Sequence, residues 1–275
     1  MEIPRFVKWA GGKQQLIEQY KPFFPKQINR FFEPFVGSGA VAFFVIQKYN
    51  PKEVFLSDIN EELINAYNIV KTDVEQLIVK LMQHKERHLV REKPYYYETR
   101  NAIPKDVLPI ERAARFIYLN KTCFNGLYRV NSKGQFNVPM GSYKNPDIVQ
   151  PDKLRKISKL IQDVSIKVMS FEKIIRLAKK GDFVYIDPPY YPLKKGRNFT
   201  SYQKGAFLEE EQKELAKVCK KLDKKGVLFM ASNSDSDFIK ELYSEFKINI
   251  VKAKRLINSK AEGRGEINEV VIRNY

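Results

Sequence analysis

The stretch that decides the fold is Phe31-Phe32-Glu33-Pro34-Phe35-Val36-Gly37-Ser38-Gly39, followed by the apolar run from Ala40 to Tyr49. The first residues predict a buried strand, and the run after the glycines predicts a helix packed on a sheet. Small residues at the turn between them let backbone amides approach a ligand closely. We therefore expect a strand, a ligand-binding turn and a helix in this order.

Strand-like and helix-like segments alternate at both ends of the chain and lose this rhythm in the middle. Further strands are predicted at 54–57, 166–170, 183–186, 227–231, 248–251 and 267–272, and further helices at 61–70, 209–222 and 235–246. Asn60 is a predicted N-cap, and residues 73–120 have a helical period interrupted at Pro94, Pro104 and Pro109. The pattern predicts a doubly wound α/β sheet split by an inserted, mainly helical lobe. The expected parts are residues 1–60, 61–149 and 150–275.

Composition limits the classes of protein. The chain has 275 residues, 43% of them hydrophobic, and a net charge of +17. It can therefore bury a substantial core, and its charge favours a polyphosphate partner. The two cysteines, Cys123 and Cys219, allow neither a disulfide framework nor a thiolate zinc site, which fits the cytoplasm. The first nine residues lack the apolar core of a signal peptide, and no apolar run is long enough to span a membrane.

Two histidines, His84 and His88, are four residues apart and could share a helix face. No third ligand is evident in the sequence, so we expect a solvated, charged helix and no metal site.

The sequence Asp187-Pro188-Pro189-Tyr190 follows the apolar run Phe183 to Ile186. The prolines make the loop rigid, and the loop carries a carboxylate, a carbonyl and a flat ring. These groups suit a planar exocyclic amine, because the Asp187 carboxylate and the Pro188 carbonyl can each accept one N–H while Tyr190 stacks on the heterocycle. The loop therefore points to chemistry on the amino group of a nucleobase.

The turn Gly37-Ser38-Gly39 and the acid Asp58, which ends the second predicted strand, fit an adenosyl cofactor. In doubly wound folds an acid at this position hydrogen-bonds the ribose hydroxyls. The turn alone does not separate NAD from S-adenosylmethionine.

Taken in order, the motifs resemble those of the Dam-type DNA adenine-N6 methyltransferases, which recognise short sites such as GATC. The matching blocks are Lys8 to Lys13, Glu33 to Gly39, Asp58 to Asn60, Asn125 to Arg129, Phe136 to Pro139, Asp187 to Tyr190, Phe199 to Tyr202, and Ser232-Asn233. The resemblance implies a Rossmann-like methyltransferase sheet, S-adenosylmethionine as cofactor and a target-recognition insert between the cofactor block and the catalytic block.

The resemblance also implies roles for single residues. Asp187, Pro188 and Tyr190 would be catalytic, and Asp187 would also lie at the cofactor. Trp9 and Lys13 would close over the cofactor, with Lys13 near its carboxylate. The other expected cofactor residues are Phe35, Gly37, Gly39, Asp58, Ser170 and Phe171.

The segment from Lys121 to Lys144 contains no acid and alternates basic with aromatic residues, which suits double-stranded DNA. Residues 130–136 have the turn residues of a β-hairpin that is narrow enough for the major groove. By resemblance, Arg129 would read a guanine, Asn125 and Leu127 would wedge base steps, and the remaining contacts would come from Lys8, Pro139 and Tyr143. Ser142 stands where relatives often carry arginine, which leaves the outer part of the recognition site open.

The expected reaction rotates adenine out of the duplex and transfers the methyl group before the proton is lost. Three alternatives remain open from the residues: methylation of cytosine N4, an RNA or protein methyltransferase, and a DNA-binding regulator without turnover. A separately acting restriction nuclease is the protein partner to consider, and a nucleoid-associated location is expected.

Overall fold

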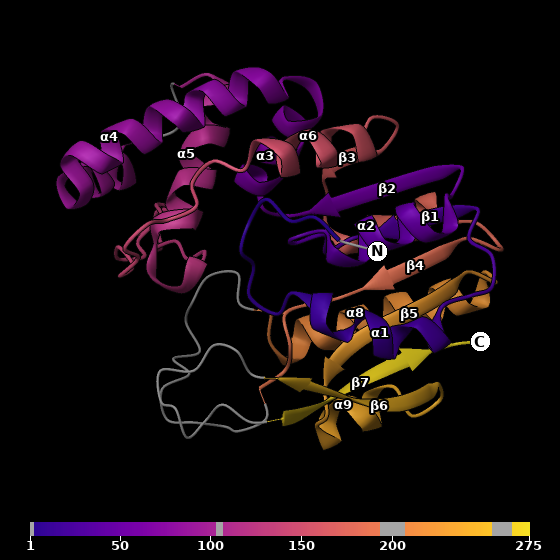
Figure 1. Ribbon diagram of the computed structural model, residues 1–275. Coiled ribbons are helices and arrows are strands. Elements are labelled where there is room, and N and C mark those ends of the chain that lie inside the picture. Colours follow the sequence, from indigo (N-terminus) through magenta and orange to yellow (C-terminus); the bar gives the residue numbers. More distant parts are fainter. Residues whose placement is uncertain (1–2, 103–106, 193–206, 255–265) are drawn as a thin grey trace. The chain divides into compact units, whose positions relative to one another are not determined.

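The computed structural model describes residues 3–102, 107–192, 207–254 and 266–275 (Figure 1). The chain divides into two compact units. Unit 1 comprises Met1–Gly12, Gly37–Phe43 and Asn60–Val168, and unit 2 comprises Lys13–Val36, Phe44–Ile59 and Met169–Tyr275.

The described residues form one sheet of seven strands in the order β3-β2-β1-β4-β5-β7-β6. The strands are β1 (Arg30–Glu33), β2 (Glu53–Asp58), β3 (Ser165–Val168), β4 (Phe183–Ile186), β5 (Leu228–Ser234), β6 (Lys247–Lys254) and β7 (Glu266–Arg273). β1 pairs in parallel with β2 and β4, and β4 pairs in parallel with β5. β7 is antiparallel to both of its neighbours. All seven predicted strands and the α/β class are confirmed.

The helices are α1 (Ile17–Tyr20), α2 (Ala40–Tyr49), α3 (Glu61–Thr72), α4 (Val74–Asn101), α5 (Pro109–Thr122), α6 (Pro151–Leu160), α7 (Ile174–Leu177), α8 (Glu209–Lys224) and α9 (Asp237–Leu242). Short 3₁₀ helices are η1 (Lys13–Leu16), η2 (Lys21–Phe23), η4 (Phe124–Gly126) and η5 (Phe171–Lys173).

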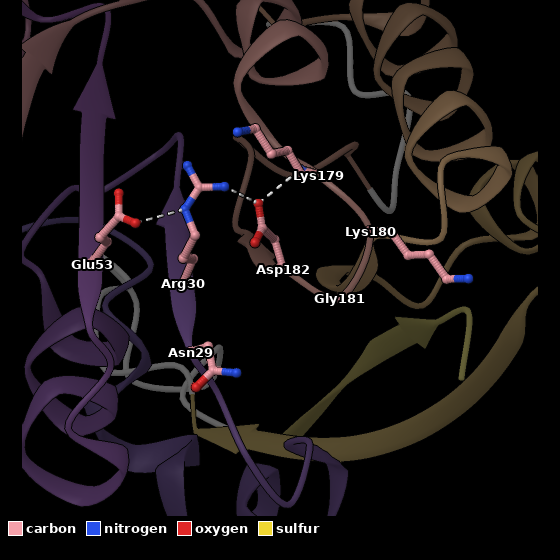
Figure 2. Close-up of a pocket in the computed structure, with 7 residues that line it drawn as sticks. All are labelled: Asn29, Arg30, Glu53, Lys179, Lys180, Gly181 and Asp182. Carbon is pink, nitrogen blue, oxygen red and sulfur yellow. Dashed lines mark hydrogen bonds and ion pairs between the residues drawn. The ribbon is translucent and has the colours of Figure 1, made fainter.

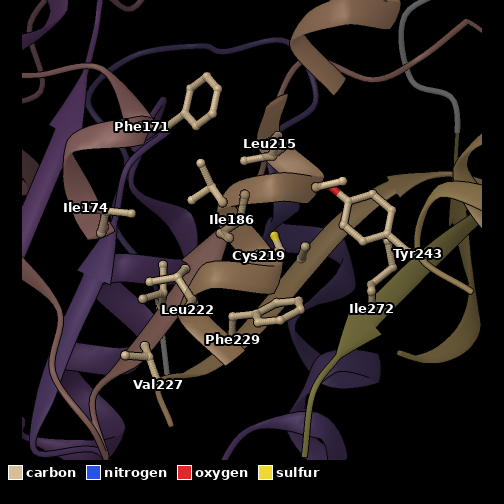
Figure 3. Close-up of a cluster of buried hydrophobic side chains, with 14 of the residues drawn as sticks. Phe171, Ile174, Ile186, Leu215, Cys219, Leu222, Val227, Phe229, Tyr243 and Ile272 are labelled. Carbon is tan, nitrogen blue, oxygen red and sulfur yellow. The ribbon is translucent and has the colours of Figure 1, made fainter. Parts of the chain in front are cut away.

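Successive side chains of β4 point to opposite faces of the sheet in unit 2, as in any strand. Val184 and Ile186 belong to the buried cluster that includes Leu215 and Leu222 of α8 (Figure 3). On the other face, the ring of Tyr185 lies 6.2 Å from that of Tyr20 in α1. Both faces are therefore covered, as a doubly wound sheet requires.

The helices of unit 1 begin and bend where the sequence predicts. The Asn60 side chain accepts a hydrogen bond from the Leu63 amide at 3.1 Å and caps α3. Glu92 leaves the helical conformation within α4, two residues before Pro94, with φ 25° and ψ −99°. Pro109 starts α5, where its missing N–H costs nothing. Pro104 lies outside the described residues.

The expectation that both histidines lie on a solvated helix is wrong. His88 is buried and shares a hydrogen bond of 3.0 Å with the Tyr118 hydroxyl. His84 stacks on the same tyrosine with ring centroids 4.8 Å apart. Tyr118 comes from α5, so the sequence around the histidines could not reveal this contact.

Candidate functional site

The Asp187 carboxylate follows β4 directly and is held by two donors in unit 2. Lys13 Nζ lies 2.9 Å from Asp187 Oδ1, and the Ser232 hydroxyl donates to the same oxygen at 2.7 Å. Lys13 is 4% exposed and Asp187 is 18% exposed. Neither Asp187 Oδ2 nor the Pro188 carbonyl accepts a hydrogen bond from the described residues. The loop thus presents two acceptors, which is what a planar amine needs.

Two buried amide side chains hold the rest of this loop. Gln212 donates to the Pro189 carbonyl at 2.9 Å, and Asn233 donates to the Gln212 side-chain oxygen at 2.9 Å. The Tyr191 amide donates to Asn233 at 3.3 Å. A buried amide that loses its hydrogen-bond partner destabilises the folded protein. This series of hydrogen bonds therefore holds the loop in one conformation. Sequence analysis included Asn233 in a motif block without a role and did not consider Gln212.

Tyr190 is anchored by a buried carboxyl group. Its hydroxyl donates to Glu269 Oε2 at 2.7 Å, and Lys13 Nζ lies 4.6 Å from the centre of its ring. Burial, followed by the repulsion of Tyr20, Asp187 and Glu269, raises the pKa of Tyr190 well above its usual value. Burial likewise raises the pKa of Glu269. Tyr190 is therefore a neutral donor whose ring is fixed in place.

Glu269 and Ser234 are direct neighbours across the antiparallel pair of β5 and β7, so their side chains point to the same face. They line a pocket of about 160 Å³ together with Tyr190, Tyr191, Pro192, Ile267 and Asn268. The Ser234 hydroxyl is buried and has no partner among the described residues. The sequence placed Ser232 in a motif block without a role, and it did not indicate Ser234 or Glu269, because the positions of these two side chains depend on strand register.

Unit 2 also contains a group of aromatic rings at the carboxyl ends of its strands. The ring of Phe35, after β1, stacks on Phe171 with centroids 5.5 Å apart, and Phe207 lies edge-on to Phe35 at 5.7 Å. The Asp58 carbonyl accepts a hydrogen bond from the Met169 amide at 3.1 Å, which joins the end of β2 to the segment that leads to Ser170. Flat apolar rings near an acid offer suitable contacts for an adenine ring and ribose hydroxyls.

Unit 1 contains the glycine turn. Gly37 has φ +47°, and a Cβ atom there would lie 2.8 Å from Cδ1 of Trp9. Gly39 has φ +73°, and its Cβ would lie 2.6 Å from the Tyr67 hydroxyl. The Tyr67 hydroxyl donates to the Gly37 carbonyl at 3.0 Å. Only glycine fits both positions without strain, and the indole of Trp9 packs against the turn at Gly37.

The residues expected at DNA also lie in unit 1. Lys8 Nζ is 4.0 Å from the centre of the Tyr143 ring, and the Lys8 amide donates to Asn120. Asn125 has φ +54°, an uncommon conformation for a residue other than glycine. Asn125, Arg129 and Pro139 are exposed, whereas Lys8, Leu127 and Tyr143 are half-buried.

The predicted hairpin is a tight turn with one antiparallel bridge, between Val130 and Phe136, and not a pair of regular strands. The Asn131 side chain accepts hydrogen bonds from the amides of Lys133 and Gln135, both at 3.0 Å. Arg129 donates from Nε to the Asn137 side chain at 2.7 Å. The motif block Phe199 to Tyr202 lies outside the described residues.

A second cleft, of about 440 Å³, lies at the opposite, amino-terminal ends of β1, β2 and β4 (Figure 2). Within it, Arg30 binds Asp182 at 2.7 Å and Glu53 at 3.3 Å. Ligands of doubly wound sheets bind at the carboxyl ends of the strands, so we assign no ligand to this cleft.

In the part of the chain that the structure describes, no group of three or more His, Cys, Asp or Glu residues could hold a metal ion. Within the same residues, no helix has both the length and the apolar character needed to cross a membrane.

Comparisons with known proteins agree on one class of enzyme. The family model of the D12 class N6 adenine-specific DNA methyltransferases matches residues 9–257. The Type II methyltransferase M.MjaIII of Methanocaldococcus jannaschii is 46% identical, with 100% of each chain covered. The Type II methyltransferase M1.LlaDCHI of Lactococcus lactis subsp. cremoris is 44% identical over 98% of this chain and 95% of its own. The DNA adenine methylase of Escherichia coli K12 is 35% identical over 97% and 93%.

Proposed function

Because the chain belongs to the D12 class N6 adenine-specific DNA methyltransferases, we propose that its target is the adenine of GATC in double-stranded DNA, reached by rotating the nucleotide out of the stack. The enzyme transfers a methyl group from S-adenosylmethionine to adenine N6 in DNA. The target inside a duplex is inaccessible to an enzyme, so extrusion at a cost of a few kcal/mol is the expected first step.

The observation that carries the catalytic proposal is the distribution of donors around Asp187. Lys13 and Ser232 both contact Oδ1, which leaves Oδ2 and the Pro188 carbonyl to accept the two N–H groups of the adenine amine. Tyr190, held by Glu269, would stack on the extruded ring. These contacts favour a pyramidal nitrogen whose lone pair can attack.

S-adenosylmethionine supplies an electrophilic methyl group on a positively charged sulfur. Carboxylates are in general too weak as bases to deprotonate a neutral aromatic amine, so the methyl transfer precedes proton loss. The Asp187 carboxylate stabilises the positive charge that develops on N6 and then accepts the proton.

The residues present fit the cofactor. In unit 2 we assign the adenine ring to Phe35 and Phe171, the ribose to Asp58, and further contacts to Lys13, Ser170 and Asp187. The stacked rings of Phe35 and Phe171 support the adenine assignment. In unit 1 we assign Trp9, Gly37 and Gly39 to the cofactor, since the two glycines have no Cβ atom and the indole of Trp9 packs directly against the turn. The contact of Lys13 with the cofactor carboxylate stays a prediction.

For DNA, Arg129 is assigned to a guanine, Asn125 and Leu127 to base steps, and Lys8, Pro139 and Tyr143 to further contacts. The exposure of Arg129, Asn125 and Pro139 supports these roles.

Residues 61–149 are proposed as the recognition insert between two catalytic parts, 1–60 and 150–275. A separately acting restriction nuclease is a proposed partner, and the nucleoid a proposed location.

The proposal is tested with purified protein, S-adenosylmethionine labelled in the methyl group, and duplexes with or without GATC. Digestion to nucleosides should place the label in 6-methyladenine, and only for duplexes that contain GATC. Label in 4-methylcytosine would refute the base assignment, and equal labelling of both duplexes would refute the site.

A further inference from the structure

Trp9 is the only tryptophan in the chain, and it contacts two functional segments of unit 1. One is the glycine turn, since a Cβ atom at Gly37 would lie 2.8 Å from Cδ1 and 3.1 Å from Nε1 of the indole. The other is the recognition segment, since the Trp9 and Tyr128 rings stack with centroids 5.8 Å apart and an interplanar angle of 24°. One side chain thus touches both segments.

The glycine turn is fixed against this indole. The Gly37 carbonyl accepts the hydrogen bond of the Tyr67 hydroxyl, and Tyr67 lies in α3 of the same unit. The Gly12 amide donates to the Trp9 carbonyl at 3.3 Å, so the backbone forms a hydrogen-bonded turn directly after the tryptophan. A ligand that changes the position of Gly37 must therefore change the position of the indole as well.

Tyr128 connects the indole to the recognition turn. It precedes Arg129, and its ring lies 5.8 Å from that of Phe136, which forms the bridge with Val130. The ring is partly buried and also contacts Phe116 at 5.6 Å. The orientation of Arg129 therefore depends on the ring that Trp9 stacks on.

We propose that the Trp9–Tyr128 stack couples the two substrates, so that DNA bound at Arg129 tightens cofactor binding at the glycine turn, and the reverse. This inference rests on the proposed roles of Gly37 and Arg129. Each ligand binds a segment that packs on the same pair of rings, so a displacement of the stack by one ligand changes the binding site of the other. Coupling between binding sites is reciprocal and commonly reaches 5- to 150-fold.

The test uses the full chain, S-adenosylhomocysteine and a GATC duplex. Calorimetry gives the dissociation constant of S-adenosylhomocysteine with and without saturating duplex. We expect the duplex to tighten binding about fivefold or more in the wild type. Tyr128→Leu removes the stacked ring, so the duplex should no longer tighten the binding of S-adenosylhomocysteine. Tyr128→Phe keeps the ring, loses only the hydroxyl group, and should retain the tighter binding in the presence of the duplex.

Trp9 fluorescence supplies a second measurement, which needs no label. Addition of the duplex alone should change the emission in the wild type and in Tyr128→Phe, and leave it unchanged in Tyr128→Leu. Equal cofactor affinity with and without DNA in the wild type would overturn the inference, and so would full coupling in a folded Tyr128→Leu variant. Failure of either ligand to bind alone would instead contradict the proposed function.

Discussion

Lys13 Nζ lies 2.9 Å from Asp187 Oδ1, on the same oxygen that receives the Ser232 hydroxyl at 2.7 Å. The pair is partly shielded from water, since Lys13 is 4% exposed, so the carboxylate is fixed by a charged partner in a medium of low polarity. Orientation of one carboxylate oxygen by the protein leaves the other for the substrate. The proposed catalytic acceptor is therefore held in place before the substrate arrives.

Replacement of Asp187 by asparagine should reduce turnover by about 10²-fold or more, because the charge that develops on N6 loses its counter-ion. The KM for DNA and for cofactor should change little, since the lost interaction is made in the transition state. Steady-state kinetics with a GATC duplex measure both. Asp58→Asn is the matched control, with an expected rise in the cofactor KM. Near-normal turnover in Asp187→Asn would show that the catalytic loop is misassigned.

Ser232 should act on the reaction through Asp187. Ser232→Ala removes one of the two donors to Oδ1 and leaves Lys13 to hold the carboxylate, so we expect turnover to fall about tenfold, which corresponds to about 1.4 kcal/mol. Ser232→Thr keeps a hydroxyl and should recover most of the loss. The Ser232 hydroxyl is also 3.1 Å from that of Tyr185, so the melting temperature of each variant must be compared. If turnover falls only in those variants whose melting temperature also falls, the role of Ser232 is purely structural.

His84 should make the helical part of unit 1 sensitive to acid. Burial, followed by the charge of Arg87, lowers the pKa of His84 to about 4, whereas it returns to about 6.5 on unfolding. The unfolded chain therefore binds more protons below pH 6.5, and stability is lost as the pH falls from 6.5 to 4. At about 1.4 kcal/mol per pKa unit, the loss approaches about 3 kcal/mol.

The variant His84→Phe keeps a ring to stack on Tyr118 and cannot be protonated. Urea denaturation at pH 7 and pH 4.5 should show a smaller acid-induced loss of stability for this variant than for the wild type. Parallel loss in the two proteins would mean that His84 is more hydrated than its contacts with Tyr95 and Tyr118 indicate.

The sequence is sufficient for those features that depend on local pattern. The apolar runs predict every strand, the run from Ala40 to Tyr49 predicts α2 with the bounds that the structure has, and Asn60 predicts the cap of α3. The proposed catalytic loop is also visible in the sequence, because two prolines after an acid are a local signal. The partners of that loop are not local. Glu269 reaches Tyr190 only because β7 enters the sheet antiparallel to β5, a pairing that no short window of sequence encodes.

The same distinction explains the errors. His84 and His88 lie among charged residues, and the neighbouring sequence suggests exposure, yet Tyr118 of another helix buries one and stacks on the other. The predicted hairpin has the expected turn residues, and within it the Asn131 side chain accepts hydrogen bonds from the amides of Lys133 and Gln135. Its two sides pair at isolated bridges, Val130 with Phe136 and Cys123 with Met140, and not along regular strands. Side chains that compete for backbone groups in this way are a known limit of patterns based on alternation.

Arg129 is oriented by its neighbour Asn137. Its Nε donates to the Asn137 side-chain oxygen at 2.7 Å and its Nη2 donates to the Asn137 carbonyl at 3.3 Å, while the side chain remains exposed. An arginine held by one edge in this way keeps donors for the paired acceptors of guanine, O6 and N7.

Arg129→Ala should therefore relax sequence choice more than it weakens binding overall. A bidentate contact with guanine discriminates against other bases by about 1–3 kcal/mol, so duplexes with a substitution at one base pair of each GATC half-site should approach the affinity and methylation rate of GATC. Competition between GATC and the single-substitution duplexes, at one fixed salt concentration, measures this ranking. Lys133→Ala, at the exposed tip of the same turn, is the control: it should weaken binding to all duplexes alike, as a phosphate contact would. If wild type and Arg129→Ala rank the duplexes in the same order and with the same ratios of affinity, Arg129 contacts the phosphate backbone, and the guanine is read by another residue.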